Sequence, residues 1–214
     1  MDEYLEDGEC SDTSRAEGHF PVDGNPLADT KPLAVSPGHP LSFAGFIRRE
    51  LTDRLGDGTG GFRHGFNPSR VHFPSPADPA SYDEEIAALG GPSVCYAGVG
   101  INGHLAFNEA PSEADTPSRV LELTPETITT NSHTALGGAF EVLPRRAVTV
   151  GMKSILSARR LSLWMNRPWQ KAVVRKLLFG DIGPDFPASY ARRHPNADLN
   201  ITALVAEVPQ FALR

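Results

Sequence analysis

The stretch that decides the fold is VCYAGVGINGHLAFNE at residues 94–109. It opens with a short apolar run over 94–97 that is followed by glycines and has the length of a buried strand in a parallel sheet. Three glycines then occur within six residues, and glycine lets a chain turn sharply and approach a ligand closely. Because open α/β sheets bind ligands at the carboxyl ends of their strands, we expect a functional site in this loop.

Strand and helix patterns alternate on either side of this stretch. We predict further strands at 70–73, 119–123, 147–150, 161–165 and 201–205. We predict helices at 42–55, at 81–89 with Ser81 as the N-cap, and at 152–158, 169–178 and 188–193. This alternation is typical of an α/β, Rossmann-like three-layer fold with a mostly parallel sheet.

The length and charge of the chain narrow its class. The 214 residues fit one domain. Residues 1–30 carry nine acidic side chains against Arg15 alone, a net charge of −8, and the whole chain has −6, so the remainder carries +2. A near-neutral body of this kind lacks the basic stripe of a nucleic-acid-binding protein. No apolar run approaches the ~20 residues that a membrane helix needs, so neither nucleic acid nor membrane is an expected partner.

The first 38 residues have an unusual composition. Residues 5–38 are rich in Asp, Glu, Gly, Pro, Ser and Thr and contain few large apolar side chains, which predicts a loop insertion. The start of the chain lacks the positive and apolar segments of a signal peptide, which favours a cytoplasmic location. Cys10 and Cys95 are too few for a disulfide framework and are not spaced as metal ligands.

The glycine-rich loop also carries the groups with the clearest chemistry. It presents the imidazole of His104 and, five residues later, the carboxylate of Glu109, a pair suited to general acid–base catalysis. The spacing of its glycines matches the dinucleotide fingerprint, but polar and aromatic residues follow where that fingerprint needs a regular helix. We therefore expect no dinucleotide cofactor. No second His or Cys stands at ligand spacing from His104, so no metal site is expected either.

Several segments carry a resemblance to a known family. GVGINGHLAFNE at 98–109 resembles the signature of the glucosamine-6-phosphate deaminases over twelve consecutive positions. Further segments resemble family motifs in the same order: MDEY at 1–4, HPLSF at 39–43, AVTVGM at 147–152, QKA at 170–172, and DFPAS to HPN over 185–196. The resemblance thus covers residues 1–214 as one domain, apart from the insertion at 5–38.

The resemblance implies a reaction and a set of site residues. Glucosamine 6-phosphate and water would become fructose 6-phosphate and ammonia through ring opening and aldose–ketose isomerisation, with no cofactor. Asp2 resembles the carboxylate that moves a proton between C2 and C1, and His104 the group that opens the ring. Glu109 would hold His104, with Asn102 nearby as a further catalytic residue. The expected substrate-binding residues are Glu3, Gly100, Gly103, His133 and Lys171, the last through the phosphate. The resemblance also allows a homo-oligomer.

The chain departs from the family pattern at several points. His133 stands where an arginine is common, and Arg167-Pro168-Trp169 replaces small residues before Lys171. The family's N-terminal strands and glycine-rich phosphate loop have no counterpart in these 214 residues. These departures leave a non-catalytic sugar-phosphate-binding or truncated homologue as an alternative. A second alternative is a 6-phosphogluconolactonase-like hydrolase, although the lactonases lack the Phe-Asn-Glu continuation at 107–109.

Overall fold

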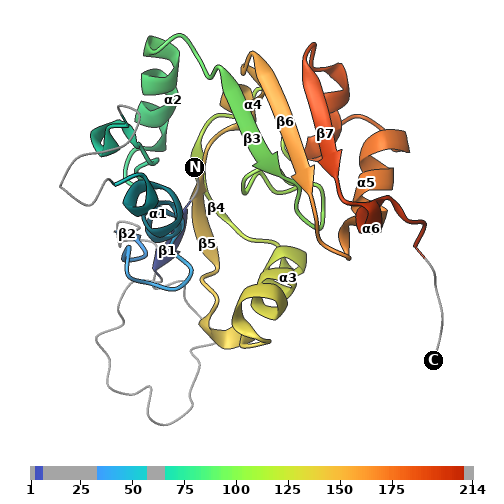
Figure 1. Cartoon of the computed structure of the whole chain (residues 1–214), viewed down its shortest axis with the longest axis horizontal. Helices are drawn as coiled ribbons and strands as arrows, with labels where there is room; N and C mark the ends of the chain where they lie inside the picture. The colour runs from blue at the N-terminus through green and yellow to red at the C-terminus, as the bar shows by residue number, and fades with distance from the viewer. Residues whose placement is uncertain (1–2, 7–32, 57–65, 210–214) are drawn as a thin grey trace, which may run out of the picture.

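The computed structural model describes residues 3–6, 33–56 and 66–209, which form two sheets (Figure 1). The parallel sheet has the order β3 (Val94–Gly98), β6 (Arg160–Met165), β7 (Ala197–Ile201). The antiparallel sheet has the order β2 (Leu33–Ala34), β1 (Glu3–Glu6), β5 (Arg146–Thr149), β4 (Arg119–Glu122). Helices lie between the parallel strands along the chain, which confirms the predicted α/β class.

The helices of the described residues are short. They are α1 (Phe43–Ile47), which runs on through a π-helical turn (Arg48–Thr52) and a 3-10 turn (Asp53–Leu55), α2 (Pro79–Ala88), α3 (Pro125–Leu136), α4 (Met152–Leu156), α5 (Gln170–Phe179) and α6 (Ala203–Ala206). Further 3-10 turns cover Pro68–Arg70, Phe140–Val142 and Pro187–Arg193. None of these helices is long and apolar enough to cross a bilayer.

The main core lies on one face of the parallel sheet. There the inward side chains of β6 pack against α4, α5 and α6; the most buried members are Leu161, Leu163, Met165, Met152, Val174 and Val205. The opposite face of the sheet exposes Val94, Tyr96 and Trp164. Within the described residues, α4, α5 and α6 therefore cover one face of this sheet.

A smaller core joins the antiparallel sheet to the loop after β3. The rings of Tyr4, Phe43 and Phe107 lie with their centroids 5.1–5.8 Å apart. Tyr4 and Phe107 are both 3% exposed, whereas Phe43 is 38% exposed, so the cluster is buried at Tyr4 and Phe107 and open to solvent at Phe43. This aromatic cluster holds the start of β1 beside the glycine-rich loop.

Two expectations about the sheets need correction. Residues 5–38 are not loop throughout, because Leu5 and Glu6 belong to β1 and pair with β2; residues 7–32 lie outside the described part. β4 and β5 occupy the residues predicted for parallel strands, but they lie in the antiparallel sheet, where β5 pairs with β1 on one side and β4 on the other. Periodicity identifies a strand without revealing its partner, which is set by distant chain.

Several boundaries also differ from the prediction. The strand predicted at 70–73 is wrong, because Asn67 caps a 3-10 turn there, with Ser69 N donating to its Oδ1. The helix predicted at 81–89 starts at Pro79 with Asp78 as its N-cap, since proline favours the first helical position. The helix predicted at 188–193 is a 3-10 helix.

The last predicted strand, at 201–205, is shifted in the structure. β7 ends at Ile201 and Thr202 then caps α6, its Oγ1 accepting from Val205 N. The helix α3 was not predicted, because its threonine-rich sequence has weak helix propensity. It forms behind the N-cap Thr124 and ends at Gly137, whose φ of +60° suits glycine.

Candidate active site

The loop after β3 folds back on itself to present His104. Gly100 N donates to His104 O over 3.0 Å, which closes the turn. A Cβ on Gly100 would lie 2.0 Å from His104 Nε2, so only glycine leaves room for the ring. Gly103 has a φ of +85°, and a Cβ there would lie 2.4 Å from the Phe186 ring. Both glycines therefore shape the loop, and their contact with substrate stays a prediction.

A buried amide ties this loop to the antiparallel sheet. Asn108 is 0% exposed and its Nδ2 donates to Leu105 O at 2.9 Å and to Val150 O at 2.8 Å. Its Oδ1 accepts from Arg119 Nη1 at 2.8 Å. Arg119 lies in a pocket where burial lowers the pKa of its guanidinium from the usual value. Asn108 and Arg119 were not predicted as site residues, although Asn108 lies within the signature itself.

The partners of His104 determine which ring nitrogen carries the proton. Its Nδ1 lies 2.8 Å from Asn102 Oδ1 and 3.4 Å from Glu109 Oε2. An amide oxygen and a carboxylate can only accept, so Nδ1 is the protonated nitrogen and the lone pair of the neutral ring is on Nε2. Nε2 has no hydrogen-bond partner among the described residues. It is therefore the atom available to exchange a proton with a bound molecule.

The carboxylate of Glu109 is held in its ionised form. Burial alone would raise the pKa of this carboxyl, but the hydrogen bond and charge of His104, with hydrogen bonds from Asn102 and Thr127, lower it to about 2. The Glu109 side chain is 7% exposed and that of His104 is 12% exposed. An ionised carboxylate and an imidazole are thus enclosed together at the carboxyl end of β3, the position predicted from the sequence.

Two threonines at the start of α3 complete this cluster, and no local sequence pattern indicated them. Thr124 Oγ1 lies 3.2 Å from Glu109 Oε2 and 3.1 Å from Asn102 Nδ2. Thr127 Oγ1 lies 3.3 Å from His104 Nδ1. The structure therefore brings Asn102, His104 and Glu109 together as predicted, and adds the start of α3 to them.

Glu3 has a different environment. Its carboxylate accepts from Ala44 N at 2.7 Å, from Phe43 N at 3.0 Å and from Ser42 Oγ at 3.0 Å. Glu3 is 3% exposed, and both of its oxygens are engaged by the first turn of α1. The residue therefore joins β1 to α1, and the predicted contact with substrate remains a prediction.

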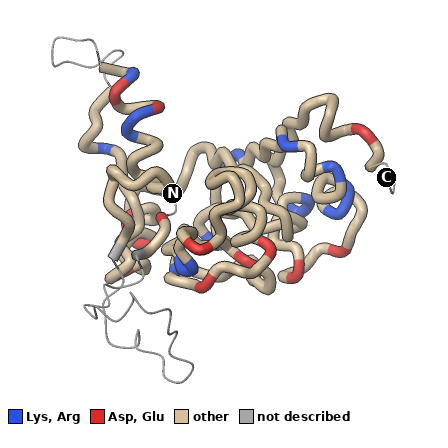
Figure 2. Tube along the Cα trace, turned by 90° about the horizontal axis from the view of Figure 1, so that it is seen from below, with Lys and Arg blue, Asp and Glu red and all other residues tan. Residues whose placement is uncertain are grey.

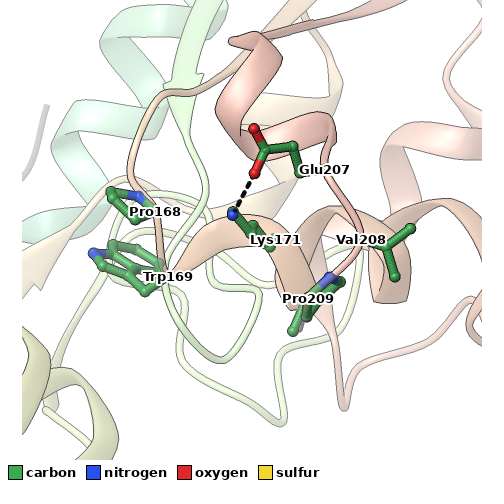
Figure 3. A pocket seen from close by; sticks show the side chains of 7 residues that line it. Pro168, Trp169, Lys171, Glu207, Val208 and Pro209 are labelled. Carbon is green, nitrogen blue, oxygen red and sulfur yellow. Dashed lines mark hydrogen bonds and ion pairs between the residues drawn. The ribbon is translucent and has the colours of Figure 1, made fainter. Parts of the chain in front are cut away.

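Lys171 lies in the first turn of α5 and lines a separate cavity of about 390 Å³ (Figure 3). The other lining residues are Pro168, Trp169, Ala172, Glu207, Val208 and Pro209. Lys171 Nζ pairs with Glu207 Oε2 at 2.9 Å, as the dashed line in Figure 3 shows. Trp169 Nε1 is buried without a hydrogen-bond partner among the described residues. His104 is not part of this lining, so the structure does not place Lys171 and His104 in one cavity.

A single glutamine connects the two regions. Gln170 Nε2 donates to Val99 O at 2.7 Å, directly before the loop that carries His104. Its Oε1 accepts from Asn166 N and Arg167 N, which follow β6. Gln170 is 4% exposed. The carboxyl ends of β3 and β6 are thereby held together, with Lys171 adjacent to the connecting residue.

The remaining predicted site residues lie apart or outside the described part. His133 is exposed on α3, and Asp2 lies outside the described residues. In the part of the chain that the structure describes, no group of three or more His, Cys, Asp or Glu side chains could hold a metal ion. Figure 2 shows basic and acidic positions interspersed along the described chain.

Comparisons with known proteins place this chain in a family. No family model matches the chain. A glucosamine-6-phosphate deaminase from Pseudarthrobacter chlorophenolicus is 31% identical over 211 residues, which cover 95% of this chain and 72% of the relative. The chain belongs to the glucosamine-6-phosphate deaminase family. Deaminases from Rhodopirellula baltica and Hahella chejuensis are 33% and 31% identical over 77% of this chain, and the matches cover 63% and 61% of those relatives. The chain therefore spans less than two thirds of their length.

Solved structures agree with membership of the deaminase family. A monomeric glucosamine-6-phosphate deaminase superposes with a TM-score of 0.68 at 27% identity, over 80% of this chain and 69% of that one. A 6-phosphogluconolactonase from Trypanosoma brucei has a TM-score of 0.51 at 20% identity, over 80% and 69% of the two chains. The second likeness concerns the fold alone. The Phe107-Asn108-Glu109 continuation, with Asn108 and Glu109 holding the loop and the imidazole, accords with the deaminases.

Proposed function

We propose that this chain converts glucosamine 6-phosphate and water to fructose 6-phosphate and ammonia. The observation that carries the proposal is the buried His104–Glu109 pair with Nε2 of His104 unengaged among the described residues. An ionised carboxylate beside a histidine stabilises the imidazolium that forms when Nε2 takes up a proton. Family membership supplies the reaction in which such a proton transfer is needed.

Ring opening is the first step that this geometry supports. Nε2 of His104 accepts the proton of the hydroxyl on C1 and a proton is delivered to the ring oxygen, which breaks the C1–O5 bond and leaves an aldehyde at C1. Glu109 and Asn102 keep the ring in place while its charge changes. Transfer of a proton from C2 to C1, together with transfer of a proton from the amino nitrogen to the C1 oxygen, then yields a hydroxymethyl group at C1 and an imine at C2. Water adds to this imine and ammonia leaves, which gives fructose 6-phosphate.

Asp2 and Lys171 take the two other roles in the proposal. Asp2 is the candidate for the transfer between C2 and C1. Its neighbour Glu3 pairs with Val148 of β5, and the next residue of β5, Thr149, accepts a hydrogen bond from Phe107 N. Lys171 is the candidate for the phosphate, whose charge favours an ammonium partner. A sugar phosphate does not cross a bilayer unaided, which fits the cytoplasmic location that the sequence predicts.

The test is turnover by the purified 214-residue chain. Glucosamine 6-phosphate is supplied, and ammonia and fructose 6-phosphate are measured in equimolar amounts, with a His104→Asn variant prepared in parallel. We expect product from the original chain and none above background from the variant. Absence of turnover by the original chain, or equal turnover by both proteins, contradicts the proposal.

A non-catalytic homologue, which binds the sugar phosphate without turning it over, is the second candidate, and the Lys171–Glu207 pair favours the loss of turnover. With its ammonium already paired, Lys171 holds a phosphate less strongly than a free lysine would. Calorimetry with glucosamine 6-phosphate separates the two functions. Heat of binding without product supports the binding protein, whereas product formation supports the deaminase.

A further inference from the structure

The two terminal atoms of the Asn102 side chain, an oxygen that accepts and a nitrogen that donates, have different neighbours. Its amide oxygen lies 2.8 Å from His104 Nδ1, whereas its amide nitrogen lies 2.5 Å from Glu109 Oε2 and 3.1 Å from Thr124 Oγ1. An amide can rotate by half a turn and exchange these two atoms at almost no change in shape. The exchange would bring an N–H donor to Nδ1, which would favour the tautomer with the proton on Nε2. Nε2 could then no longer accept a proton.

We propose that Thr124 is a positioning residue that fixes the orientation of the Asn102 amide and thereby selects the tautomer of His104. The inference rests on the proposed function, in which Nε2 of His104 must accept a proton. Thr124 acts through Asn102 and Glu109, and its own side chain does not contact the imidazole in the described hydrogen bonds.

The single hydroxyl proton of Thr124 allows it to serve both neighbours. Its donor is directed to Glu109 Oε2, which can only accept, at 3.2 Å. The lone pairs of Oγ1 then face the donors Asn102 Nδ2 at 3.1 Å and Thr127 N at 3.4 Å. An amide oxygen in the place of Nδ2 would meet two oxygens with lone pairs, which costs the hydrogen bonds and adds repulsion. The hydroxyl thus keeps both Glu109 and the amide in one arrangement.

The position of Thr124 in the fold supports this role. Thr124 is the N-cap of α3, so its side chain is held by the first turn of a twelve-residue helix. Glu109 is the one charged side chain that contacts His104 within the described residues, and the Phe107 ring lies 6.1 Å from the imidazole. The state of the ring therefore depends mainly on the amide and on the carboxylate, and Thr124 contacts both.

Thr124→Val tests the inference, because valine keeps the shape and removes the hydroxyl. We read the tautomer of His104 from the ¹⁵N shifts of its two ring nitrogens at neutral pH, which requires no turnover. We expect Nδ1-protonated imidazole in the original chain and a clear population protonated at Nε2 in the variant. Where turnover is measurable, kcat falls about tenfold while KM changes little, because the lost contact serves proton transfer. Thr124→Ser restores both readouts.

Loss of the N-cap is a separate effect that needs its own control. Asp78→Ala removes the N-cap of another helix, α2, and should lower stability by a similar amount. This variant should lower stability as Thr124→Val does and leave the tautomer unchanged. Thr124→Gly removes the hydroxyl and every other side-chain donor at a position where glycine is also a favoured N-cap, and it replaces Thr124→Val as the test if the latter does not fold.

The outcomes separate this inference from the proposed function. Folded Thr124→Val or Thr124→Gly proteins with the tautomer of the original chain overturn the inference, whether or not the chain turns over substrate. A change of tautomer in Asp78→Ala also overturns it, because cap loss alone would then explain the effect. A change restricted to the Thr124 variants and restored by serine supports the inference even if deaminase activity is absent.

Discussion

The surroundings of His104 and of Lys171 differ in burial and in the number of side chains that hold each group in place. The imidazole is 12% exposed and its carboxylate partner 7%, with Asn102, Thr124 and Thr127 fixed around them. The ammonium of Lys171 is 22% exposed and pairs with a carboxylate that is 61% exposed. Exposed ion pairs contribute little free energy, whereas an enclosed pair with further hydrogen bonds is held firmly. The groups around His104, the proposed proton acceptor, are therefore fixed in the structure before any ligand binds. Lys171, the cation proposed for the phosphate, is held only by an exposed carboxylate that a ligand could displace.

Removal of the imidazole should have the largest effect of any single change. His104→Asn keeps a polar side chain but removes the proton acceptor at Nε2, and general acid–base catalysis contributes about 10²–10⁴-fold to a rate. We expect kcat to fall by about 10³-fold in the ammonia assay. His72→Asn is the control, because this half-exposed histidine pairs with Glu85 on the surface. Retention of more than a tenth of the activity by His104→Asn would remove the imidazole from the proposed mechanism.

The enclosed pair should also make stability depend on pH. The pKa of Glu109 is about 2 in the folded chain against its ordinary 4.5, so the unfolded state binds this proton first as the pH falls. The stabilisation is complete above pH 4.5 and is lost between pH 4.5 and pH 2. Its size is about 3 kcal/mol in the free energy of unfolding.

Urea denaturation at intervals from pH 5 to pH 2.5 measures this dependence. Glu109→Gln should reduce the loss of stability across this range, because the glutamine binds no proton. Glu84→Gln on the exposed surface of α2 should leave the loss as it is in the original chain. Identical pH dependence in all three proteins would contradict the low pKa of Glu109.

The sequence predicted the enclosed region because its main parts are local. Asn102, His104 and Glu109 lie within eight residues on one glycine-rich loop, so a single turn brings them together. The strands β3 and β6 beside it were predicted within a residue of their ends from their apolar runs, but the expected burial of β3 is wrong, because Val94 and Tyr96 are exposed. Local pattern was sufficient where the contacts were local.

The sequence did not predict the contacts between distant segments. Thr124 reaches Glu109 from a helix that has weak helical propensity, and it does so only after the antiparallel sheet has placed α3 beside the loop. Lys171 and Glu207 are separated by 36 residues, and no spacing rule relates them. Periodicity did not predict β1 for a similar reason, because its four residues precede an acidic segment and form a strand through pairing with the distant β5 and β2. Tertiary pairing decided all three cases.

Loss of the ammonium should weaken substrate binding more than it slows chemistry. Lys171→Met keeps the length of the side chain and removes the charge, and a hydrogen bond between charged groups contributes about 1.5–3 kcal/mol. We therefore expect the Kd for glucosamine 6-phosphate in calorimetry to rise about 10–100-fold. Lys153→Met is the control, on an exposed side chain of α4. An unchanged Kd for Lys171→Met would show that the phosphate is bound elsewhere.

The smallest effect should come from Glu207, and its sign is opposite to that of the Lys171 change. Glu207 follows α6, whose Val205 is fully buried, and Arg175 Nη2 donates to Ala206 O at 2.9 Å, so the carboxylate is held near Lys171 by its own segment. A bound phosphate would have to displace this carboxylate or remain beside it, and both cost free energy. Glu207→Gln removes the charge and keeps the shape, and an exposed pair is worth up to about 1 kcal/mol. The Kd for glucosamine 6-phosphate should therefore fall severalfold at low salt, and the gain should shrink as salt screens the charges. A Kd that rises in Glu207→Gln would show instead that the carboxylate orients Lys171 for its ligand. The surroundings of Lys171 would then be arranged for a ligand in the same way as those of His104.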